Sequence, residues 1–331
     1  MILQVCPNDH PPFADVLTTY ESALRLAGLS VQTIVLQAPT GDPLPNVTYL
    51  NEGDVRDARL PELAVPRAVI CHRYRASKAV AQSPLSGVPR LVVAHEFGYF
   101  ARTRRRLSAR FERDVTYAGV SPPVVEEMSV GRRKALLLPN VLDVSKLKLA
   151  DRAAARAELG LPEDARIIGW VGRLHEKKKP LTAIAAMTDA PPGAHLAVLG
   201  AGDLEQPMRL AAEGLPVTFC GNVANAKNLY AAFDVLLITS TGAEAFGMTA
   251  LEALAASVPV VCGATPGPQY VLGDLGVYAN SQTPVDIGAA LARALEIDSA
   301  RYAKQAAERV RKKFSVERLS ERLSDWLEIA Q

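Results

Sequence analysis

The sequence predicts an α/β protein built from two doubly wound parallel sheets. Short apolar runs alternate with amphipathic stretches, and this alternation occurs twice, on either side of a Pro- and Asn-containing break at residues 138–143. Strands covered on both faces read as continuous apolar runs, and their alternation with helices implies parallel sheets with right-handed crossovers. A chain of 331 residues is long enough for two such domains.

In the first half, short runs of apolar residues mark the expected strands. These are Ile2–Val5, Val31–Leu36, Ala68–Cys71, Leu91–Ala94, Val115–Ala118 and Ala135–Leu138. Between the first two, the segment Asp15–Ala27 has apolar residues at helical spacing and is followed by Gly28, a common helix stop.

The second half repeats the scheme. Its expected strands are Ile167–Val171, Leu196–Leu199, Val217–Phe219, Val235–Ile238, Val258–Val261 and Val277–Tyr278, with helices notably at Thr249–Ala256, Val285–Leu295 and Ser315–Ile329. We therefore expect an N-terminal domain over residues 1–142 and a second domain over residues 143–314. The C-terminal helix, residues 315–331, is expected to pack back toward the first domain.

Composition excludes several classes of protein. An apolar fraction of 49% with 22% charged residues is typical of a globular chain, and the formal net charge of +2 argues against nucleic-acid binding. No apolar stretch approaches the roughly 18 residues of a membrane span, and the N-terminus does not read as a signal peptide. The widely spaced Cys6, Cys71, Cys220 and Cys262 indicate free thiols, so we expect a cytoplasmic protein.

The exit of the expected strand Ile167–Val171 is strongly basic. Arg173, Lys177, Lys178 and Lys179 follow within a few residues. Ligands of open parallel sheets bind at the carboxyl ends of strands, so these cations could clamp a diphosphate. A solvated basic turn would show the same pattern.

The exit of Val235–Ile238 combines a glycine, a helix start and two carboxylates. Gly247 permits close approach of the backbone, and the N–H groups of Met248 and Thr249 at the helix start can face an anion. Glu252, one turn into the helix, is placed to accept hydrogen bonds from a ribose diol. Alternatively, Glu252 only complements the helix dipole.

Together these segments resemble the retaining glycosyltransferases of family 4, which have the GT-B fold. Glu244 and Glu252 have the spacing of that family's two-glutamate motif, within EAFGMTALEALAASVPVV. The other similar landmarks, in order, are Val120-Ser121, residues 138–143, Gly172-Arg173-Leu174 with Lys178, and residues 220–223. The resemblance implies two Rossmann-like domains that face one another across a cleft.

The resemblance also implies a role for each matching residue. Arg173 and Lys178 would hold the donor diphosphate, Glu252 the ribose and Glu244 the donor sugar. The backbone amides of Phe246, Gly247, Met248 and Thr249 would touch sugar and phosphate, and Asn222 and Val223 would lie near the base. His95, at the end of Leu91–Ala94, would face the bond that breaks.

The implied reaction is transfer of a hexose with retention, from a nucleoside diphosphate sugar such as UDP-glucose. No acidic cluster lies near the segments expected to bind the diphosphate, so we expect no metal and no other cofactor. Arg173 and Lys178 would stabilise the charge of the leaving diphosphate in place of a metal ion. The family's usual Gly-Gly in the first strand–helix loop is replaced by Pro7-Asn8-Asp9-His10-Pro11-Pro12-Phe13, and Ser257 stands where a glycine is common.

A cluster of arginines marks a possible acceptor or membrane surface. It comprises Arg102, Arg104, Arg105, Arg106, Arg110 and Arg113, and the segment Cys71-His72-Arg73-Tyr74-Arg75 could extend it. Such a surface suits an anionic, phosphorylated glycan or glycolipid acceptor, such as lipopolysaccharide core, or the inner face of the cytoplasmic membrane. A solvated helix is the alternative.

Three other functions remain alternatives. The segment Gly200-Ala201-Gly202 follows a strand and begins like a dinucleotide fingerprint, but its third position is Glu205, and it does not lie in the first strand–helix unit. A sugar-nucleotide epimerase of the same fold would need no acceptor. A catalytically silent nucleotide-sugar-binding protein would not need both glutamates and both cations.

Overall fold

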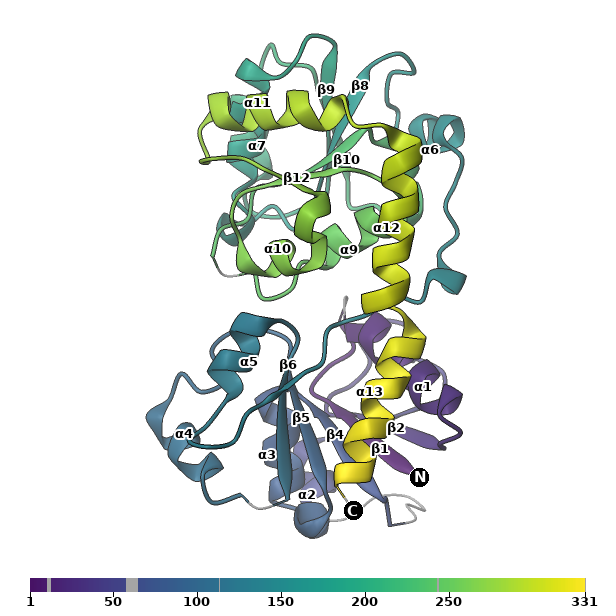
Figure 1. Ribbon diagram of the computed structural model, residues 1–331, viewed down its shortest axis with the longest axis vertical. Coiled ribbons are helices and arrows are strands. Elements are labelled where there is room, and N and C mark those ends of the chain that lie inside the picture. Colours follow the sequence, from purple (N-terminus) through teal and green to yellow (C-terminus); the bar gives the residue numbers. More distant parts are fainter. Residues whose placement is uncertain (11–12, 58–64, 113, 243, 331) are drawn as a thin grey trace. The chain divides into compact units, whose positions relative to one another are not determined.

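The computed structural model describes residues 1–10, 13–57, 65–112, 114–242 and 244–330. The chain forms two compact units (Figure 1). One comprises Met1–Leu142 together with Lys313–Gln331, and the other comprises Asp143–Lys312. Each unit contains one parallel sheet with helices packed on it.

In the described part of the first unit, seven parallel strands lie in the order β3-β2-β1-β4-β5-β6-β7. The strands are β1 (Ile2–Cys6), β2 (Val31–Val35), β3 (Val47–Tyr49), β4 (Ala68–His72), β5 (Arg90–Ala94), β6 (Val115–Gly119) and β7 (Leu136–Leu137). The helices are α1 (Phe13–Leu26), α2 (Glu52–Arg56), α3 (Arg73–Ala81), α4 (Thr103–Ala109), α5 (Pro122–Met128) and α13 (Val316–Ile329).

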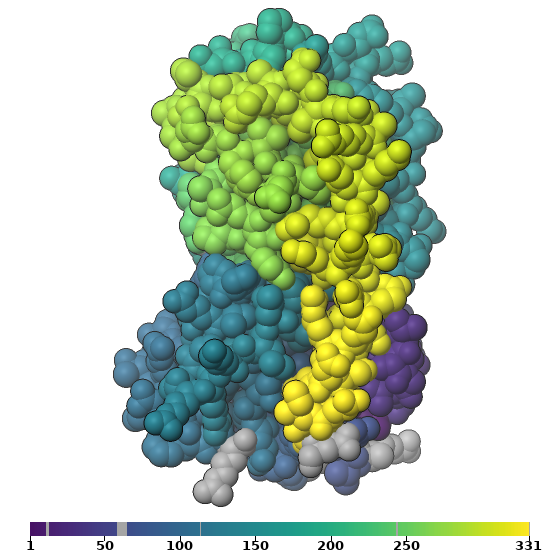
Figure 2. Space-filling model, viewed as in Figure 1, coloured from purple at the N-terminus to yellow at the C-terminus, as the bar shows by residue number. Residues whose placement is uncertain are grey.

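The middle of this sheet is fully buried. Every residue of β1, β4 and β5 is buried, as expected for strands covered on both faces. The C-terminal helix α13 packs against α1 and buries Leu319, Leu323, Trp326 and Leu327. Figure 2 shows this last stretch, in yellow, beside the purple N-terminal segment. The end of the chain therefore completes the core of the first unit.

In the described part of the second unit, six parallel strands lie in the order β10-β9-β8-β11-β12-β13. The strands are β8 (Arg166–Val171), β9 (Ala194–Leu199), β10 (Val217–Gly221), β11 (Val235–Ile238), β12 (Val260–Cys262) and β13 (Gly276–Tyr278). The helices are α6 (Arg152–Glu158), α7 (Pro180–Ala186), α8 (Glu205–Ala211), α9 (Met248–Ala255), α10 (Pro266–Leu272), α11 (Pro284–Leu295) and α12 (Ser299–Lys313).

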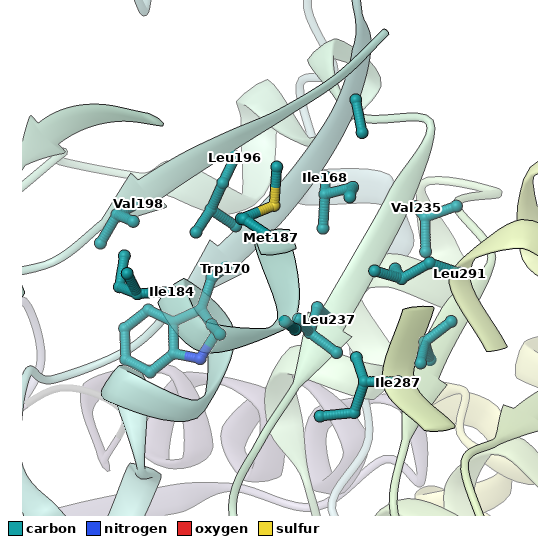
Figure 3. Packing of buried hydrophobic residues seen from close by; sticks show 14 of the residues in the cluster. Ile168, Trp170, Ile184, Met187, Leu196, Val198, Val235, Leu237, Ile287 and Leu291 are labelled. Atoms are coloured by element: carbon teal, nitrogen blue, oxygen red, sulfur yellow. The ribbon is translucent and has the colours of Figure 1, made fainter. Parts of the chain in front are cut away.

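The core of the second unit packs α7 and α11 against β8, β9 and β11. Figure 3 shows Ile168 and Trp170 from β8 among Ile184, Leu237 and Ile287. Each such fully buried aliphatic side chain stabilises the fold by about 1.5–3 kcal/mol. The core thereby fixes the strand ends, and with them the loops that carry the polar residues of the sequence motifs.

All strands that the sequence predicts are present, and their boundaries differ from the expected ones by at most two residues. The sequence did not predict β3, because Val47-Thr48-Tyr49 is a short, half-buried edge strand without a continuous apolar run. The strand expected at Ala135–Leu138 is reduced to β7. The strand expected at Val258–Val261 begins later, at Val260, because Ser257 has a left-handed backbone (φ 60°) and turns the chain before it.

Sheet order reverses at one place in each unit. In the first unit the reversal lies between β1 and β4, and in the second between β8 and β11. At such a point the two loops that leave the strands diverge to opposite faces of the sheet and leave a crevice that ligands occupy. The topology therefore predicts one ligand-binding crevice in each unit.

Candidate active site

In the second unit, the reversal point brings the two motif segments together. The loop after β8 carries the basic residues 173–179, and the loop after β11 carries residues 239–247, of which Ala243 lies outside the described residues. Lys178 and Glu244, 66 positions apart, meet there. This contact could not be read from either segment alone.

The basic loop is ordered by its own turns. Residues Glu176–Lys178 form a 3-10 turn, and Lys179, in the left-handed region at φ 48°, ends it just before α7 begins. Arg173 is exposed, whereas the side chain of Lys178 is only about one-third exposed (34%). Of the four cations, Lys178 is thus the one directed at the carboxylate motif.

Glu244 is held on both sides. Its Oε1 lies 2.9 Å from Nζ of Lys178, and its Oε2 accepts a hydrogen bond from the hydroxyl of Ser240. Only 11% of the Glu244 side chain is exposed, so the ion pair is screened less by solvent than a surface pair. The cluster presents a carboxylate and an ammonium group in fixed positions at one strand end.

A buried relay links this cluster to the core. The indole Nε1–H of Trp170 donates to Oγ1 of Thr239 at 2.8 Å, and the Thr239 hydroxyl donates to the backbone carbonyl of Lys178 at 2.8 Å. Trp170 and Thr239 are both buried. The relay therefore joins the ends of β8 and β11 and fixes the backbone from which Lys178 projects.

The start of α9 is built for close approach. Gly247, at φ 94°, precedes the helix, and no side chain caps the first turn, which begins at Met248 and Thr249. Phe246 is buried, and a Cβ at Gly267 would lie 2.3 Å from the carbonyl oxygen of Glu244. The positive end of the helix dipole thus lies beside the Lys178–Glu244 pair.

Glu252, on the first turns of α9, has a buried partner. The Tyr230 hydroxyl donates to Oε2 of Glu252 at 3.0 Å. Burial, and then the nearby carboxylate, raise the pKa of Tyr230 well above its ordinary value, so it stays a donor. Tyr230 therefore fixes the orientation of the Glu252 carboxylate.

Asn222 and Val223 lie apart from this cluster. They follow β10 at the edge of the sheet, where Gly221 has a positive φ of 69°. Asn222 is exposed and Val223 is half-buried. The structure places them at the same carboxyl edge of the sheet as the other motif residues.

In the first unit, His95 directly follows β5 and belongs to a chain of polar contacts in which it is half-buried and its partners are buried. Its Nδ1 lies 3.0 Å from Oδ1 of Asn140, and its Nε2 lies 2.9 Å from Nδ1 of His72. His72 Nε2 in turn lies 3.3 Å from Oε1 of Gln4. Both ring nitrogens of His95 thus have protein partners.

Burial dominates the electrostatics of this pair. It lowers the pKa of His95 to about 4, with the Asn140 contact opposing and Arg73 adding to the effect, and it lowers the pKa of His72 well below 6.5. Both imidazoles are therefore neutral at pH 7. His95 would have to exchange one partner before a ring nitrogen could contact a substrate.

The described arginines of the cluster lie on α4 and at its two ends, and they differ in exposure. Arg102, Arg104, Arg106 and Arg110 are exposed, Arg105 is half-buried, and Arg113 lies outside the described residues. Arg105 lines a cavity together with Arg73, Tyr74 and Arg75. The structure thus joins one member of the cluster to the Cys71–Arg75 segment.

Two negative findings apply to the described residues only. None of their helices is both long and apolar enough to cross a membrane. Likewise, in this part of the chain no three His, Cys, Asp or Glu side chains gather as a metal ion would require.

Comparison with known proteins identifies the second unit. The family model described as "Glycosyl transferases group 1" matches residues 151–313. These residues form a glycosyl transferases group 1 domain. The Lys178–Glu244 pair, the start of α9 and Glu252 all belong to it.

Curated relatives of the group 1 domain are transferases by name. The D-inositol 3-phosphate glycosyltransferase of Segniliparus rotundus is 32% identical over 167 residues, 46% of this chain and 37% of that protein. The 2-deoxystreptamine N-acetyl-D-glucosaminyltransferase of Streptomyces fradiae is 32% identical over 232 residues, 66% of this chain and 52% of that protein. The chain thus spans between about a third and a half of the length of these relatives.

Solved structures show that the fold extends over the whole chain. Sucrose-phosphate synthase of Thermosynechococcus elongatus matches with a TM-score of 0.79 at 20% identity, covering 99% of this chain and 98% of that one. The Anabaena protein HepE, crystallised with UDP and glucose, matches with a TM-score of 0.78 at 18% identity, with 99% of each chain covered. The chain therefore has two parallel-sheet α/β domains of the GT-B type, as the sequence predicts.

The sequence did not predict the contacts of four polar residues of the site. Ser240 and Thr239 stand inside the motif segment but carry no spacing signal of their own, Tyr230 lies outside the motifs, and His72 was singled out only as part of the Cys71–Arg75 segment. Thr239 and His72 act through contacts set by strand order. A polar residue at a strand end next to the reversal point was the available signal for Thr239 and His72.

Proposed function

We propose that this chain is a retaining glycosyltransferase of family 4 that moves a hexose from a nucleoside diphosphate sugar to a glycan acceptor. The observation that carries the proposal is the Lys178–Glu244 pair beside the start of α9, with Glu252 one turn further on. A cation, a helix dipole and two oriented carboxylates are what a sugar diphosphate with a ribose requires. Crystal structures of Anabaena HepE contain UDP and UDP-glucose, which supports a UDP-hexose as donor.

In the proposed complex, Arg173 and Lys178 bind the diphosphate and Glu252 binds the ribose hydroxyls. Lys178 exchanges Glu244 for phosphate, and Glu244, still held by Ser240, accepts from the hydroxyls of the donor sugar. The amides of residues 246–249 contact sugar and phosphate. Asn222 and Val223 lie toward the base.

The proposed step needs no metal. As the bond between C1 and the phosphate oxygen breaks, negative charge develops on the diphosphate, and Arg173, Lys178 and the start of α9 stabilise it. Each cation contributes on the order of 3 kcal/mol to the transition state. The acceptor oxygen bonds to C1 on the face that the diphosphate leaves, and its proton passes to the leaving phosphate oxygen. His95 lies beside the acceptor and positions the sugar once a ring nitrogen is released.

The acceptor is proposed to be a glycan or glycolipid, and lipopolysaccharide core is one candidate. One of the matching structures is WaaG, described as a glycosyltransferase of lipopolysaccharide biosynthesis. The exposed arginines of α4 would hold the enzyme at the inner face of the cytoplasmic membrane, on anionic headgroups.

A cycle of two changes tests the donor site. Wild-type protein and the Glu252→Gln variant are titrated by calorimetry with UDP and with 2′,3′-dideoxy-UDP. Hydrogen bonds to a charged group contribute about 1.5–3 kcal/mol, so wild-type protein should bind UDP at least about tenfold more tightly, and the variant should lose this discrimination. Glu205→Gln, in an exposed pair with Arg209 on α8, is the control and should discriminate as wild type does. Equal discrimination in Glu252→Gln would exclude the proposed ribose contact.

The reaction itself is followed by proton NMR. Transfer to an acceptor with an α-configured product from an α-configured donor supports retention, and a β-configured product excludes it. Conversion of the donor sugar to its epimer without acceptor would identify an epimerase instead.

A further inference from the structure

The first unit has its own cavity, and the cavity lies at the reversal point of the sheet. Its volume is about 340 Å³. Its wall comes from the loop after β1 (Pro7, Asn8), the start of α3 after β4 (residues 73–75) and the loop after β5 (residues 95–99). This is where an open parallel sheet binds a ligand, and the volume suits one substituted sugar or polyol ring.

The wall carries more arginines than carboxylates, although Arg75 also pairs with Glu52 outside the wall. It contains Arg73, Arg75 and Arg105 but, among its described residues, only one carboxylate, that of Glu96. Glu96 pairs with Arg73 at 3.2 Å, but its side chain is 61% exposed. An exposed pair of this kind contributes little energy, so an anion with better geometry can displace Glu96 from Arg73.

Arg73 adopts a costly backbone conformation to point here. It is the first residue of α3 and has φ 69°, in the left-handed region that disfavours a long side chain. Its guanidinium lies 4.2 Å above the ring of Phe13, and among the described residues its buried Nε has no hydrogen-bond partner. Strain together with an unpaired buried donor indicates a functional constraint, since neither stabilises the fold.

Arg105 lines the same cavity and shares the ring-stacked guanidinium and the unpaired Nε of Arg73, but its backbone is not in the left-handed region. Its guanidinium stacks on Tyr74 at 3.7 Å and donates to the carbonyl of Tyr99 at 3.2 Å. Its buried Nε, like that of Arg73, has no partner in the described part of the chain. Arg105 and Tyr74 also line a neighbouring cavity of about 390 Å³.

We propose that this cavity binds the phosphate monoester group of a phosphorylated sugar or polyol unit, with Arg73 and Arg105 as its ligands. The bound unit belongs to the acceptor of the transfer proposed above, so the acceptor role rests on that proposed function, whereas the binding site does not. Two arginines that line one cavity, each with a buried Nε–H that has no partner among the described residues, match a dianion with several acceptor oxygens. The start of α3, which has no side-chain cap, adds a favourable dipole.

Direct titration of the full chain tests the site. The probes are myo-inositol 3-phosphate and glucose 6-phosphate, with myo-inositol and glucose as neutral counterparts, followed by calorimetry. Wild-type protein should bind at least one phosphate ester tenfold or more tightly than its neutral counterpart. Arg73→Asn and Arg105→Gln should each weaken that binding by tenfold or more. Asn tolerates the left-handed backbone of residue 73, so the first variant should keep its fold.

The matched control is Arg106→Gln, next to Arg105 but exposed and outside the cavity wall. It should bind the ester as wild type does. Equal loss in Arg106→Gln and Arg73→Asn would mean a general charge effect and would overturn the proposal, as would equal affinity for esters and neutral counterparts. Binding only to vesicles of phosphatidylglycerol and phosphatidylcholine, and to none of the esters, would also overturn it.

The two proposals fail separately. Arg73→Asn should leave the affinity for UDP unchanged, because the UDP site is proposed in the second unit. Ester binding without UDP binding in wild-type protein would support the cavity and contradict the transferase proposal. UDP binding without ester binding would support the donor site of the transferase proposal and contradict the proposed phosphate site in the cavity.

Discussion

At the scale of single residues, the His72–His95 pair has one N–H group fewer than it has polar contacts. The chain of contacts from Asn140 through His95 and His72 to Gln4 has three links and ends on two carboxamide oxygens. Two neutral imidazoles supply only two N–H groups. If His95 donates to Asn140 and His72 donates to His95, then His72 Nε2 and Gln4 Oε1 face each other as two acceptors. That contact is the longest of the three, at 3.3 Å.

This arrangement makes the stability of the first unit depend on pH. Burial lowers the pKa of His95 to about 4. As the pH falls below about 6.5, the unfolded chain therefore binds a proton at this imidazole, whereas the folded chain does not bind it until about pH 4. The free energy of unfolding should therefore be constant above about pH 7 and fall by up to about 1.4 kcal/mol per pH unit and imidazole between pH 6.5 and pH 4. Urea unfolding of the Trp170→Phe protein, followed through the fluorescence of Trp326, measures it.

The variant that isolates the effect is His95→Gln. Its stability should fall less steeply over the same pH range, while His10→Gln, changed at an exposed histidine of the same unit, should follow wild type. An identical slope in wild type and His95→Gln would show that carboxylates alone set the acid limb.

At the scale of elements, one loop supports another. Gly200, directly after β9, has φ 144°, and a Cβ there would lie 1.9 Å from the carbonyl oxygen of Gly172. Gly202 approaches the carbonyl of Leu174 in the same way, at 2.5 Å for the added Cβ. The Leu174 N–H donates to the carbonyl of Ala201 at 3.0 Å. The Gly200-Ala201-Gly202 segment therefore holds the backbone of the basic loop, which explains its glycines without a dinucleotide.

Replacing Gly200 should disturb the donor site at a distance. In Gly200→Ala the basic loop must move away, so we expect a loss of at least about 2 kcal/mol in the free energy of unfolding and at least tenfold weaker binding of UDP. Gly193→Ala is the control, because Gly193 also has a positive φ (76°), just before β9, but has open space around it. It should cost about 1 kcal/mol and leave UDP affinity unchanged. Calorimetry and thermal unfolding of both variants give the comparison, and equal UDP affinities would contradict it.

How far the sequence could predict these elements depends on whether each strand is buried on both faces or lies at the solvent-exposed edge of its sheet. Strands such as β8 and β11 can be predicted from the sequence, since Ile167, Ile168 and the run Val235–Ile238 are apolar on both faces. The edge strand β3 does not, because half of its environment is solvent. The motif residues Glu244 and Glu252 were predictable by resemblance, but their partners were not.

The partners were hidden because sheet order, not sequence distance, brings them together. Lys178 meets Glu244 because β8 pairs with β11, and His72 meets His95 because β4 pairs with β5. The strained φ of Arg73 has no signature in sequence at all, since arginine is not a residue that favours it. A sequence pattern thus predicts the strand ends, whereas the chemistry at those ends requires the topology.

At the scale of the whole molecule, the chain enters the second unit after Leu142 and returns to the first after Lys312. The two tryptophans are divided between the units: Trp170 is buried in the core of the second, and Trp326, on α13, is buried in the first. In the described part of the chain, the indole N–H of Trp326 has no hydrogen-bond partner, so Trp326→Phe removes no bond. Each single-tryptophan variant therefore reports on one core.

With these reporters, we expect the two cores to respond to different changes. Leu323→Ala removes a fully buried side chain of α13 and should lower the free energy of unfolding seen by Trp326 by about 2–5 kcal/mol, with little change in the transition seen by Trp170. UDP should do the opposite, raising only the transition seen by Trp170, because a ligand stabilises the unit that binds it. Leu210→Ala, at a side chain that is 62% exposed on α8, should move either transition by no more than about 0.5 kcal/mol. If Leu323→Ala and UDP shift both transitions together, the two units unfold as a single cooperative body. The two connections of the chain, after Leu142 and after Lys312, would then couple the two cores energetically.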